Sequence, residues 1–116
     1  MRENVLKVKS YAFAIRVVKL YQYLCNELKE YVLGKQVLRS GTAIGALICE
    51  GEFAQSKPDF INKLSIALKE ANETLYWLNI LHDTDYLNLE IYESLKTDNE
   101  EIVKLLIASI KTAKGK

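Results

Sequence analysis

The 116-residue sequence is poor in the residues that interrupt helices, because it has one proline, Pro58, and five glycines. Folds made of many short strands need frequent turns, and turns are rich in glycine and proline. Hydrophobic residues make up 49% of the chain and charged residues 27%, which is typical of a globular domain and not of a disordered segment. The composition therefore predicts one domain, residues 1–116, built from long helices around a single core.

Long hydrophobic runs are also lacking. The longest uncharged run, Ser40 to Cys49, is too short to cross a bilayer. The first residues, MRENVLKVKSY, have no apolar segment ahead of their charges and do not resemble a secretory signal. We therefore expect a cytoplasmic protein that has no contact with a membrane. The only cysteines, Cys25 and Cys49, are expected to be reduced and buried, with a disulfide or a shared metal as the alternative.

Neither sign of charge dominates, since 16 basic and 15 acidic side chains leave a formal net charge of +1. The chain thus lacks the overall basicity that is typical of nucleic-acid-binding proteins, and such a role would depend on a local cluster.

Motifs for metal binding and catalysis are lacking as well. Di-metal helical bundles need Glu-x-x-His on two helices, but this chain has one histidine, His82, with Asn79 three residues before it. No nucleophile motif, glycine-rich phosphate loop or cysteine-pair zinc site is present. The sequence predicts no enzyme, no metal and no cofactor, and it predicts His82 at a helix end or in a loop.

What the sequence does contain is helical periodicity, with apolar residues three and four apart in four segments. We predict helices over residues 4–30, 35–54, 57–81 and 88–113. Asn4 is the expected N-cap of the first, Gly34 the turn before the second, and Ser56 with Asp59 a capping box for the third. Short connections favour an all-α, antiparallel, up-down-up-down four-helix bundle. The first two helices are apolar over more than one face, more than one packing contact needs.

Within the second helix, Gly41 and Gly45 lie four residues apart and so share a face. A glycine inside a helix costs about 1 kcal/mol relative to alanine. We expect that cost to be offset by close packing of another helix against this face.

The antiparallel arrangement also predicts ion pairs between the second and third helices. Around a turn near Gln55, facing positions have numbers that sum to about 110. This places Arg39 level with Glu70 and Glu73, and Glu50 level with Lys63. Such pairs either fix helix register or form part of a ligand site, and both interpretations stay open.

Three segments resemble one known family. They are SYAFAIRVVKLYQYL at 10–24, LRSGTAIGALICEG at 38–51 and DFINKLSIALKEANETLYWL at 59–78. All three are similar to the 23S rRNA intervening-sequence proteins, which are small bacterial four-helix bundles. The chain departs from the family pattern at Leu47, where asparagine is usual, and at Cys49, where alanine is usual.

The resemblance implies a ring-like homopentamer with no catalytic activity. Some members of the family are encoded inside insertions in ribosomal RNA genes. A related branch is the accessory variability factor of diversity-generating retroelements, which binds a reverse transcriptase and nucleic acid. The resemblance therefore implies self-assembly, and RNA, DNA or a nucleic-acid enzyme as further partners.

Charge at one end of the bundle is the sequence's only hint of such a partner. The start of the first helix and the end of the last share that end in an up-down-up-down bundle. In a ring, the cluster would repeat as a basic rim that contacts phosphates. The alternative is a solvated end that complements the helix dipoles. Its members are Arg2, Lys7, Lys9, Lys111, Lys114 and Lys116.

Two functional hypotheses follow. The first is a non-enzymatic, self-assembling scaffold or adaptor, with nucleic acid among its candidate partners. The second is a small-molecule binder or enzyme with a site in the bundle core, lined by Arg39, Glu50, Glu70 and tyrosines.

Overall fold

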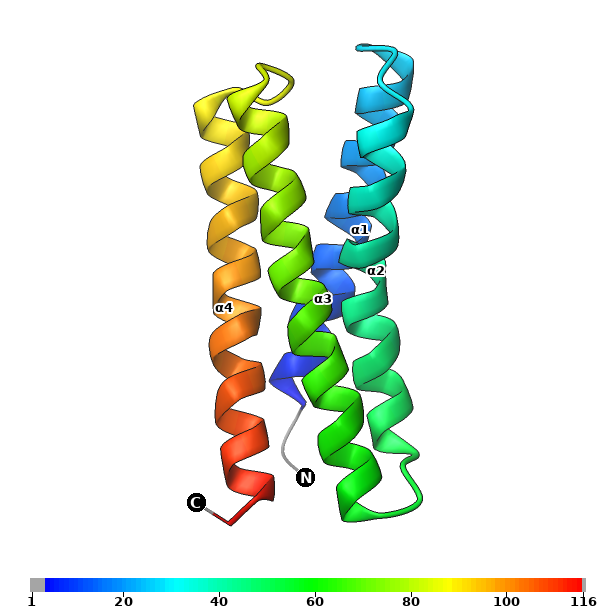
Figure 1. The fold of residues 1–116 in the computed structure, drawn as a ribbon, viewed down its shortest axis with the longest axis vertical. Coiled ribbons are helices and arrows are strands. Elements are labelled where there is room, and N and C mark those ends of the chain that lie inside the picture. The colour runs from blue at the N-terminus through cyan, green and yellow to red at the C-terminus, as the bar shows by residue number, and fades with distance from the viewer. Residues whose placement is uncertain (1–3, 116) are drawn as a thin grey trace.

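The structure, a computed structural model, describes residues 4–115 and consists of four helices that run alternately up and down (Figure 1). The predicted all-α, up-down-up-down four-helix bundle is confirmed. Because successive helices are antiparallel, α1 begins and α4 ends at the same end of the bundle, which we call the termini end. The helices are α1 (Val5–Asn26), α2 (Val32–Glu52), α3 (Lys57–Asp83) and α4 (Leu89–Ala113).

One hydrophobic core lies between the helices and follows the periodicity of the sequence. Each helix buries residues three and four apart, and complete burial of one large aliphatic side chain contributes about 2 kcal/mol. The largest fully buried apolar side chains are Phe13, Val17, Leu24, Val37, Ile44, Leu64, Leu78, Leu81, Leu87, Ile102 and Leu106.

Side-chain caps fix where three of the helices begin. Asn4 Oδ1 accepts a hydrogen bond from Lys7 N at 3.0 Å, and Asn88 Oδ1 accepts one from Ile91 N at 2.8 Å. Ser56 Oγ accepts from Asp59 N at 3.2 Å. These oxygens satisfy N–H groups that have no partner within the helix, so the caps set the helix boundaries.

The connection between α1 and α2 differs from the prediction. Helix α1 ends at Asn26 and not at Glu30, because Lys29 has a left-handed backbone with φ of 56°. The carboxylate of Glu30 accepts hydrogen bonds from the N–H groups of Val32, at 3.3 Å, and Gly34, at 2.8 Å. Helix α2 therefore begins at Val32, three residues earlier than predicted. Gly34 lies buried inside this helix and not in the turn.

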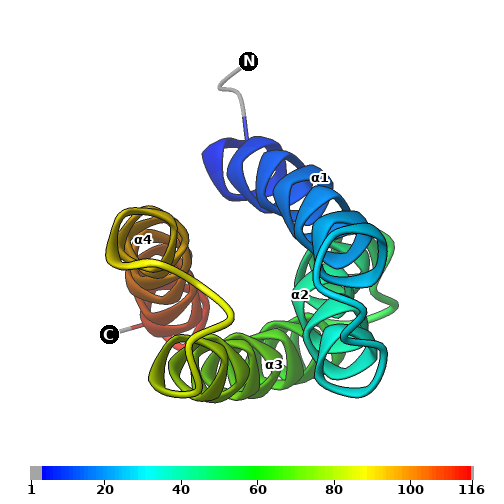
Figure 2. The same cartoon turned by 90° about the horizontal axis from the view of Figure 1, so that it is seen from above.

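The four helices do not surround the core evenly. Seen along the bundle, they follow one another around an open arc from α1 to α4 (Figure 2). Helices α2 and α3 have the most extensive contact, while α1 and α4 touch least of all the packed pairs. One side of the bundle is thus more weakly closed than the others.

Candidate interaction surface

Gly41 and Gly45 of α2 face α1. A Cβ on Gly41 would lie 2.8 Å from both methyl groups of Val17, a distance that real side chains do not tolerate. A Cβ on Gly45 would lie 3.4 Å from the carbonyl oxygen of Ser10. The absence of side chains at these two positions therefore lets α1 approach α2 closely.

Gly45, together with other small residues, also leaves a groove on the outer side of the α1–α2 pair. Its volume is about 510 Å³, and its walls are mostly apolar. A groove rather than a ridge forms here because Thr42, Gly45 and Ala46 of α2 and Ala14 of α1 are short. The other lining residues are Lys7, Val8, Ser10, Tyr11 and Cys49.

Beside this groove, α1 exposes an apolar stripe to solvent. It consists of Val8, Tyr11, Ile15 and Val18, whose exposed fractions are 50%, 69%, 43% and 38%. The spacings of three and four residues place them on one face of the helix. We call these four residues the α1 outer stripe. The sequence signalled a wide apolar surface on this helix, but did not separate this stripe from the residues facing the core.

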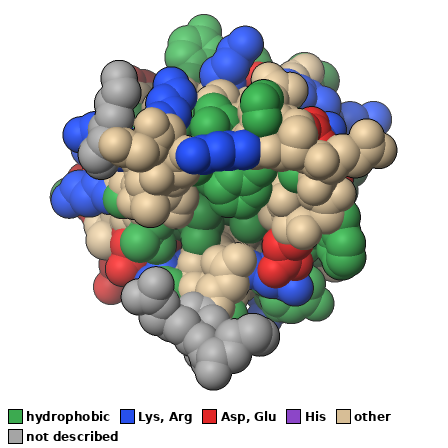
Figure 3. All heavy atoms as spheres, turned by 90° about the horizontal axis from the view of Figure 1, so that it is seen from below, with side chains coloured by type: hydrophobic (Ala, Val, Ile, Leu, Met, Phe, Trp, Pro, Cys, Tyr) green, Lys and Arg blue, Asp and Glu red, His purple; other side chains and the backbone are tan. Residues whose placement is uncertain are grey.

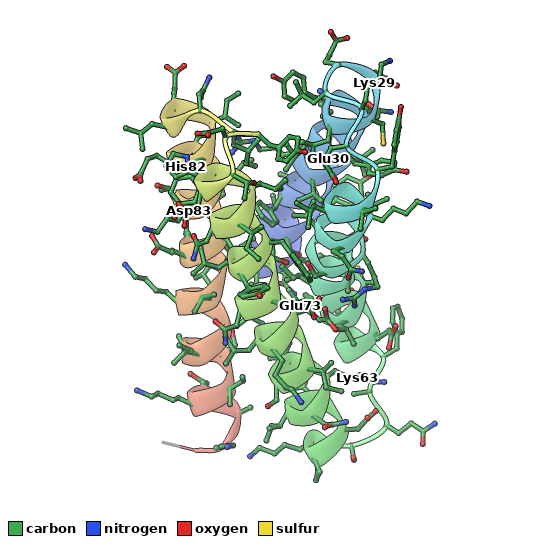
Figure 4. All side chains as sticks on the ribbon, turned by 45° about the horizontal axis from the view of Figure 1, so that its top comes forward. Lys29, Glu30, Lys63, Glu73, His82 and Asp83 are labelled. Carbon is green, nitrogen blue, oxygen red and sulfur yellow. The ribbon has the colours of Figure 1, made fainter. Side chains whose placement is uncertain are left out.

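The structure brings together the five residues of the predicted ion pairs between α2 and α3. Arg39 Nη1 lies 3.6 Å from Glu70 Oε1, and Arg39 Nη2 contacts Glu73 Oε2. Lys63 Nζ lies 3.2 Å from Glu50 Oε1. Figure 4 shows Glu73 and Lys63 along the length of α3. Both interpretations of these pairs, as contacts that fix helix register and as part of a ligand site, stay predictions.

A further contact at Glu73 was not expected. Trp77 Nε1 donates a hydrogen bond to Glu73 Oε2 at 2.9 Å, so this carboxylate serves both Arg39 and Trp77. Deeper in the same interface, Thr74 Oγ1 lies 2.9 Å from Ser40 Oγ and donates to Glu70 O at 2.8 Å. Both hydroxyls are fully buried, and no sequence motif marks them.

The predicted basic cluster is only partly assembled. Lys7 Nζ lies 2.9 Å from Glu52 Oε1, and the hydrogen bond and charge of that carboxylate raise the pKa of Lys7. Lys9 Nζ lies 3.3 Å from Glu101 Oε1 on α4. These two lysines thus have acidic partners within the chain, while a basic rim in an assembled ring stays a prediction.

Of the other four residues in the predicted basic cluster, the structure describes two. Lys111 and Lys114 are exposed at the end of α4, where Figure 3 shows Lys and Arg side chains spread around the termini end. Arg2 and Lys116 lie outside the described residues.

Over residues 4–115, no group of three or more His, Cys, Asp or Glu side chains is arranged to hold a metal. Cys25 and Cys49 are free and half-buried. His82 lies in the last turn of α3 (Figure 4), where its ring stacks on Tyr92 with centroids 4.3 Å apart. In the same part of the chain, no helix is long and apolar enough to cross a membrane.

Comparison with known proteins adds a family and a fold. The 23S rRNA-intervening sequence protein family matches residues 2–108. A crystal structure of a protein with unknown function from the S23 ribosomal protein family of Bacteroides thetaiotaomicron VPI-5482 is 62% identical. The match covers 92% of this chain and 99% of that chain, with a TM-score of 0.92. No curated protein matches the chain.

Proposed function

This chain belongs to the 23S rRNA-intervening sequence protein family, and we propose that it is a non-enzymatic scaffold that assembles with copies of itself through α1 and α2. The observation that carries this proposal is the α1 outer stripe beside the α1–α2 groove. Contiguous apolar surface on a small protein marks an interaction site, because exposing it to water is unfavourable.

A second copy of the chain is the occupant that fits this surface. A helix that presents apolar residues three and four apart binds well in an apolar groove. The chain offers both parts, since the α1 outer stripe is such a ridge and the small residues of α2 floor such a groove. The stripe and the groove share Val8 and Tyr11, so they form one continuous apolar surface on which another copy can pack. Where two copies use different parts of this surface, for example Ile15 and Val18 of one against the groove of the next, the contact is head-to-tail, and such contacts close into rings. The family resemblance predicts five subunits in the ring.

Light scattering coupled to size-exclusion chromatography tests the assembly. We expect the wild type to elute as one species with the mass of about five chains, by the family resemblance. Tyr11→Glu combined with Val18→Glu places charges in the stripe and should give monomers, because an unpaired charge is not tolerated in an apolar interface.

Tyr76→Glu is the matched control for that experiment. Tyr76 lies on α3, outside the stripe, and is 57% exposed, so the variant should retain the wild-type mass. Circular dichroism establishes that each variant remains helical. A monomeric wild type, or a stripe variant of unchanged mass, would overturn the proposal.

Nucleic-acid binding at the termini end is a second candidate function. It is supported by Lys111 and Lys114, which are exposed on the last turn of α4 and just after it. In a ring these lysines recur once per subunit, and repeated phosphate contacts give binding that weakens steeply with salt. The ion pairs of Lys7 and Lys9 reduce this cluster to fewer cations than predicted, and the affinity expected of a single subunit falls accordingly.

Fluorescence anisotropy with labelled single-stranded RNA and duplex DNA tests this role. Lys111→Glu combined with Lys114→Glu should weaken binding at least about tenfold and flatten its salt dependence. Lys35→Glu combined with Lys69→Glu makes the same change of net charge on exposed residues of α2 and α3, and should have a smaller effect. Equal losses in both variants would point to net charge alone and remove the termini end as a site.

A small-molecule or enzymatic site in the core has less support. The largest buried side chains are almost all aliphatic, and the buried hydroxyls of Ser40 and Thr74 bond to each other. Arg39 and Glu50, expected to line such a site, are exposed on the surface. Among the described residues, the buried side-chain oxygens that lack a hydrogen-bond partner are Glu70 Oε1 and Asn99 Oδ1. Two such oxygens are fewer converging polar groups than a ligand or a reaction needs.

A further inference from the structure

The side of the bundle between α1 and α4 is closed differently from the others. These two helices make the least extensive contact of the packed pairs and border the open part of the arc in Figure 2. Two shallow hollows lie between them, with volumes of about 230 Å³ and about 130 Å³. One is lined by Leu20, Ile91 and Leu95, among others, so the core lies directly beneath it.

Charged side chains bridge this side. Arg16 Nη1 lies 2.6 Å from Asp98 Oδ2, and Arg16 Nη2 donates to Ser94 Oγ at 3.0 Å. Lys9 pairs with Glu101 at 3.3 Å. The four charged side chains are between 38% and 52% exposed. Ion pairs with this degree of exposure contribute little to stability, and salt screens their attraction.

A buried amide lies behind the bridge. Asn99 follows Asp98 on α4 and is fully buried. Its Nδ2 donates to Ala71 O of α3 at 3.0 Å, whereas its Oδ1 has no hydrogen-bond partner among the described residues. A buried acceptor without a partner favours any state in which water reaches it.

The opposite side of the bundle is built to stay closed. There α2 and α3 make their extensive contact, with the buried Ser40–Thr74 hydrogen bond and the ion pairs of Arg39 and Lys63. The bundle thus divides into two hairpins, α1–α2 and α3–α4, joined along α2 and α3.

We propose that the two hairpins separate along α1 and α4 while α2 and α3 stay in contact, and that the Arg16–Asp98 and Lys9–Glu101 pairs form a latch that sets how often this happens. Opening exposes the inner faces of α1 and α4 without unfolding either helix. The device does not depend on self-assembly, since each of its contacts lies within one chain.

Reaction of a buried thiol with a small thiol reagent measures the opening. In a background with Cys25→Ser and Cys49→Ala, Leu95→Cys reports on the latch side, since Leu95 is 2% exposed and lines a hollow there. Val37→Cys, at a fully buried position of α2, reports on complete unfolding. Urea denaturation of each variant gives its global stability, against which the labelling rates are compared. Ile102→Cys is a second latch-side probe, at a position 1% exposed.

Arg16→Gln combined with Lys9→Gln should speed labelling of Leu95→Cys by about tenfold, because two weak ion pairs are lost. Labelling of Val37→Cys should speed by a similar factor, because complete unfolding also breaks both pairs, but it should stay at the rate that global stability sets, far below that of Leu95→Cys. Raising NaCl from about 0.05 M to about 0.5 M should speed labelling of Leu95→Cys only when the latch is intact.

The matched control removes the ion pair on the closed side. Lys63→Gln combined with Glu50→Gln should leave labelling of Leu95→Cys unchanged. The proposal is overturned if both probes react only at the rate of global unfolding, or if the latch variant and the control have equal effects.

Discussion

Helices α2 and α4 border the same core but are held in place by different means. Helix α2 lies against both α1 and α3, and Gly41 lets it approach the methyl groups of Val17. Helix α4 packs closely only against α3, and Arg16 and Lys9 reach across to it from α1. The residues at the contact therefore decide how near two helices come. Glycine brings backbones together, whereas long charged side chains span a gap and leave it adjustable.

Of the changes considered, adding a side chain at the close α1–α2 contact should lower the free energy of unfolding most. Gly41→Val places methyl groups where the Cβ alone would lie 2.8 Å from Val17. We expect the free energy of unfolding to fall by about 3 kcal/mol, since overpacking of this severity outweighs the better helix propensity. Urea denaturation measures the change.

The control is a glycine of the same helix that has room. A Cβ on Gly51 would lie 3.5 Å from the nearest atom of Phe60, an ordinary contact. Gly51→Ala should therefore raise stability by as much as about 1 kcal/mol through helix propensity. If Gly41→Val is no less stable than the wild type, the glycine does not set the distance between α1 and α2.

A substitution in α4 should change the free energy of unfolding by less and in the opposite direction. Asn99→Leu has a similar shape and removes the amide whose Oδ1 lacks a partner among the described residues. We expect the free energy of unfolding to rise by about 1 kcal/mol, because the desolvation cost of that oxygen exceeds the value of the bond to Ala71 O. The exposed change Asn72→Leu should be near neutral. Marked destabilisation by Asn99→Leu would instead make the Ala71 bond a main attachment of α4.

This contrast also explains what the sequence could reveal. Helical periodicity and capping residues depend on local chemistry, so the four helices and the caps at Asn4 and Ser56 were predictable. The antiparallel register gave the partners of Arg39 and Lys63, because facing positions follow from one turn. The glycine spacing likewise pointed to close packing.

Other features depend on the tertiary arrangement and were missed. The end of α1 at Asn26 follows from the left-handed backbone of Lys29 and from the hydrogen bonds of Glu30, which no periodicity reveals. The partners of Lys7 and Lys9 lie on other helices, more than forty residues away along the chain. The α1 outer stripe could not be separated from the core face, because both are apolar and only the packed structure shows which side α2 covers.

The ion pairs between α2 and α3 should each contribute a modest coupling energy to stability. In double-mutant cycles, Arg39→Ala with Glu73→Ala should couple by about 1 kcal/mol, and Lys63→Ala with Glu50→Ala by about 0.5 kcal/mol. The first should be larger because Trp77 holds the Glu73 carboxylate in place. Arg39→Ala should couple more weakly with Glu70→Ala, whose contact is 3.6 Å. If Arg39→Ala couples with neither Glu70→Ala nor Glu73→Ala, the ion pairs of Arg39 do not contribute to the attachment of α2 to α3.

The smallest effect concerns the ion pair between Lys7 and Glu52, which crosses the close α1–α2 contact. Glu52 raises the pKa of Lys7 above the ordinary 10.5, so the folded state binds this proton more tightly than the unfolded chain does. The pair therefore stabilises the folded state fully at pH values below 10.5, the pKa of lysine in the unfolded chain. This stabilisation is lost as the pH rises through the higher pKa of Lys7 in the folded state. Thermal unfolding midpoints of wild type and Lys7→Gln should differ slightly at neutral pH and converge in alkali. Because Gly41 and Val17 already fix the distance between these helices, a large difference between the two proteins at neutral pH would show that charge, and not residue size, holds α2 to α1.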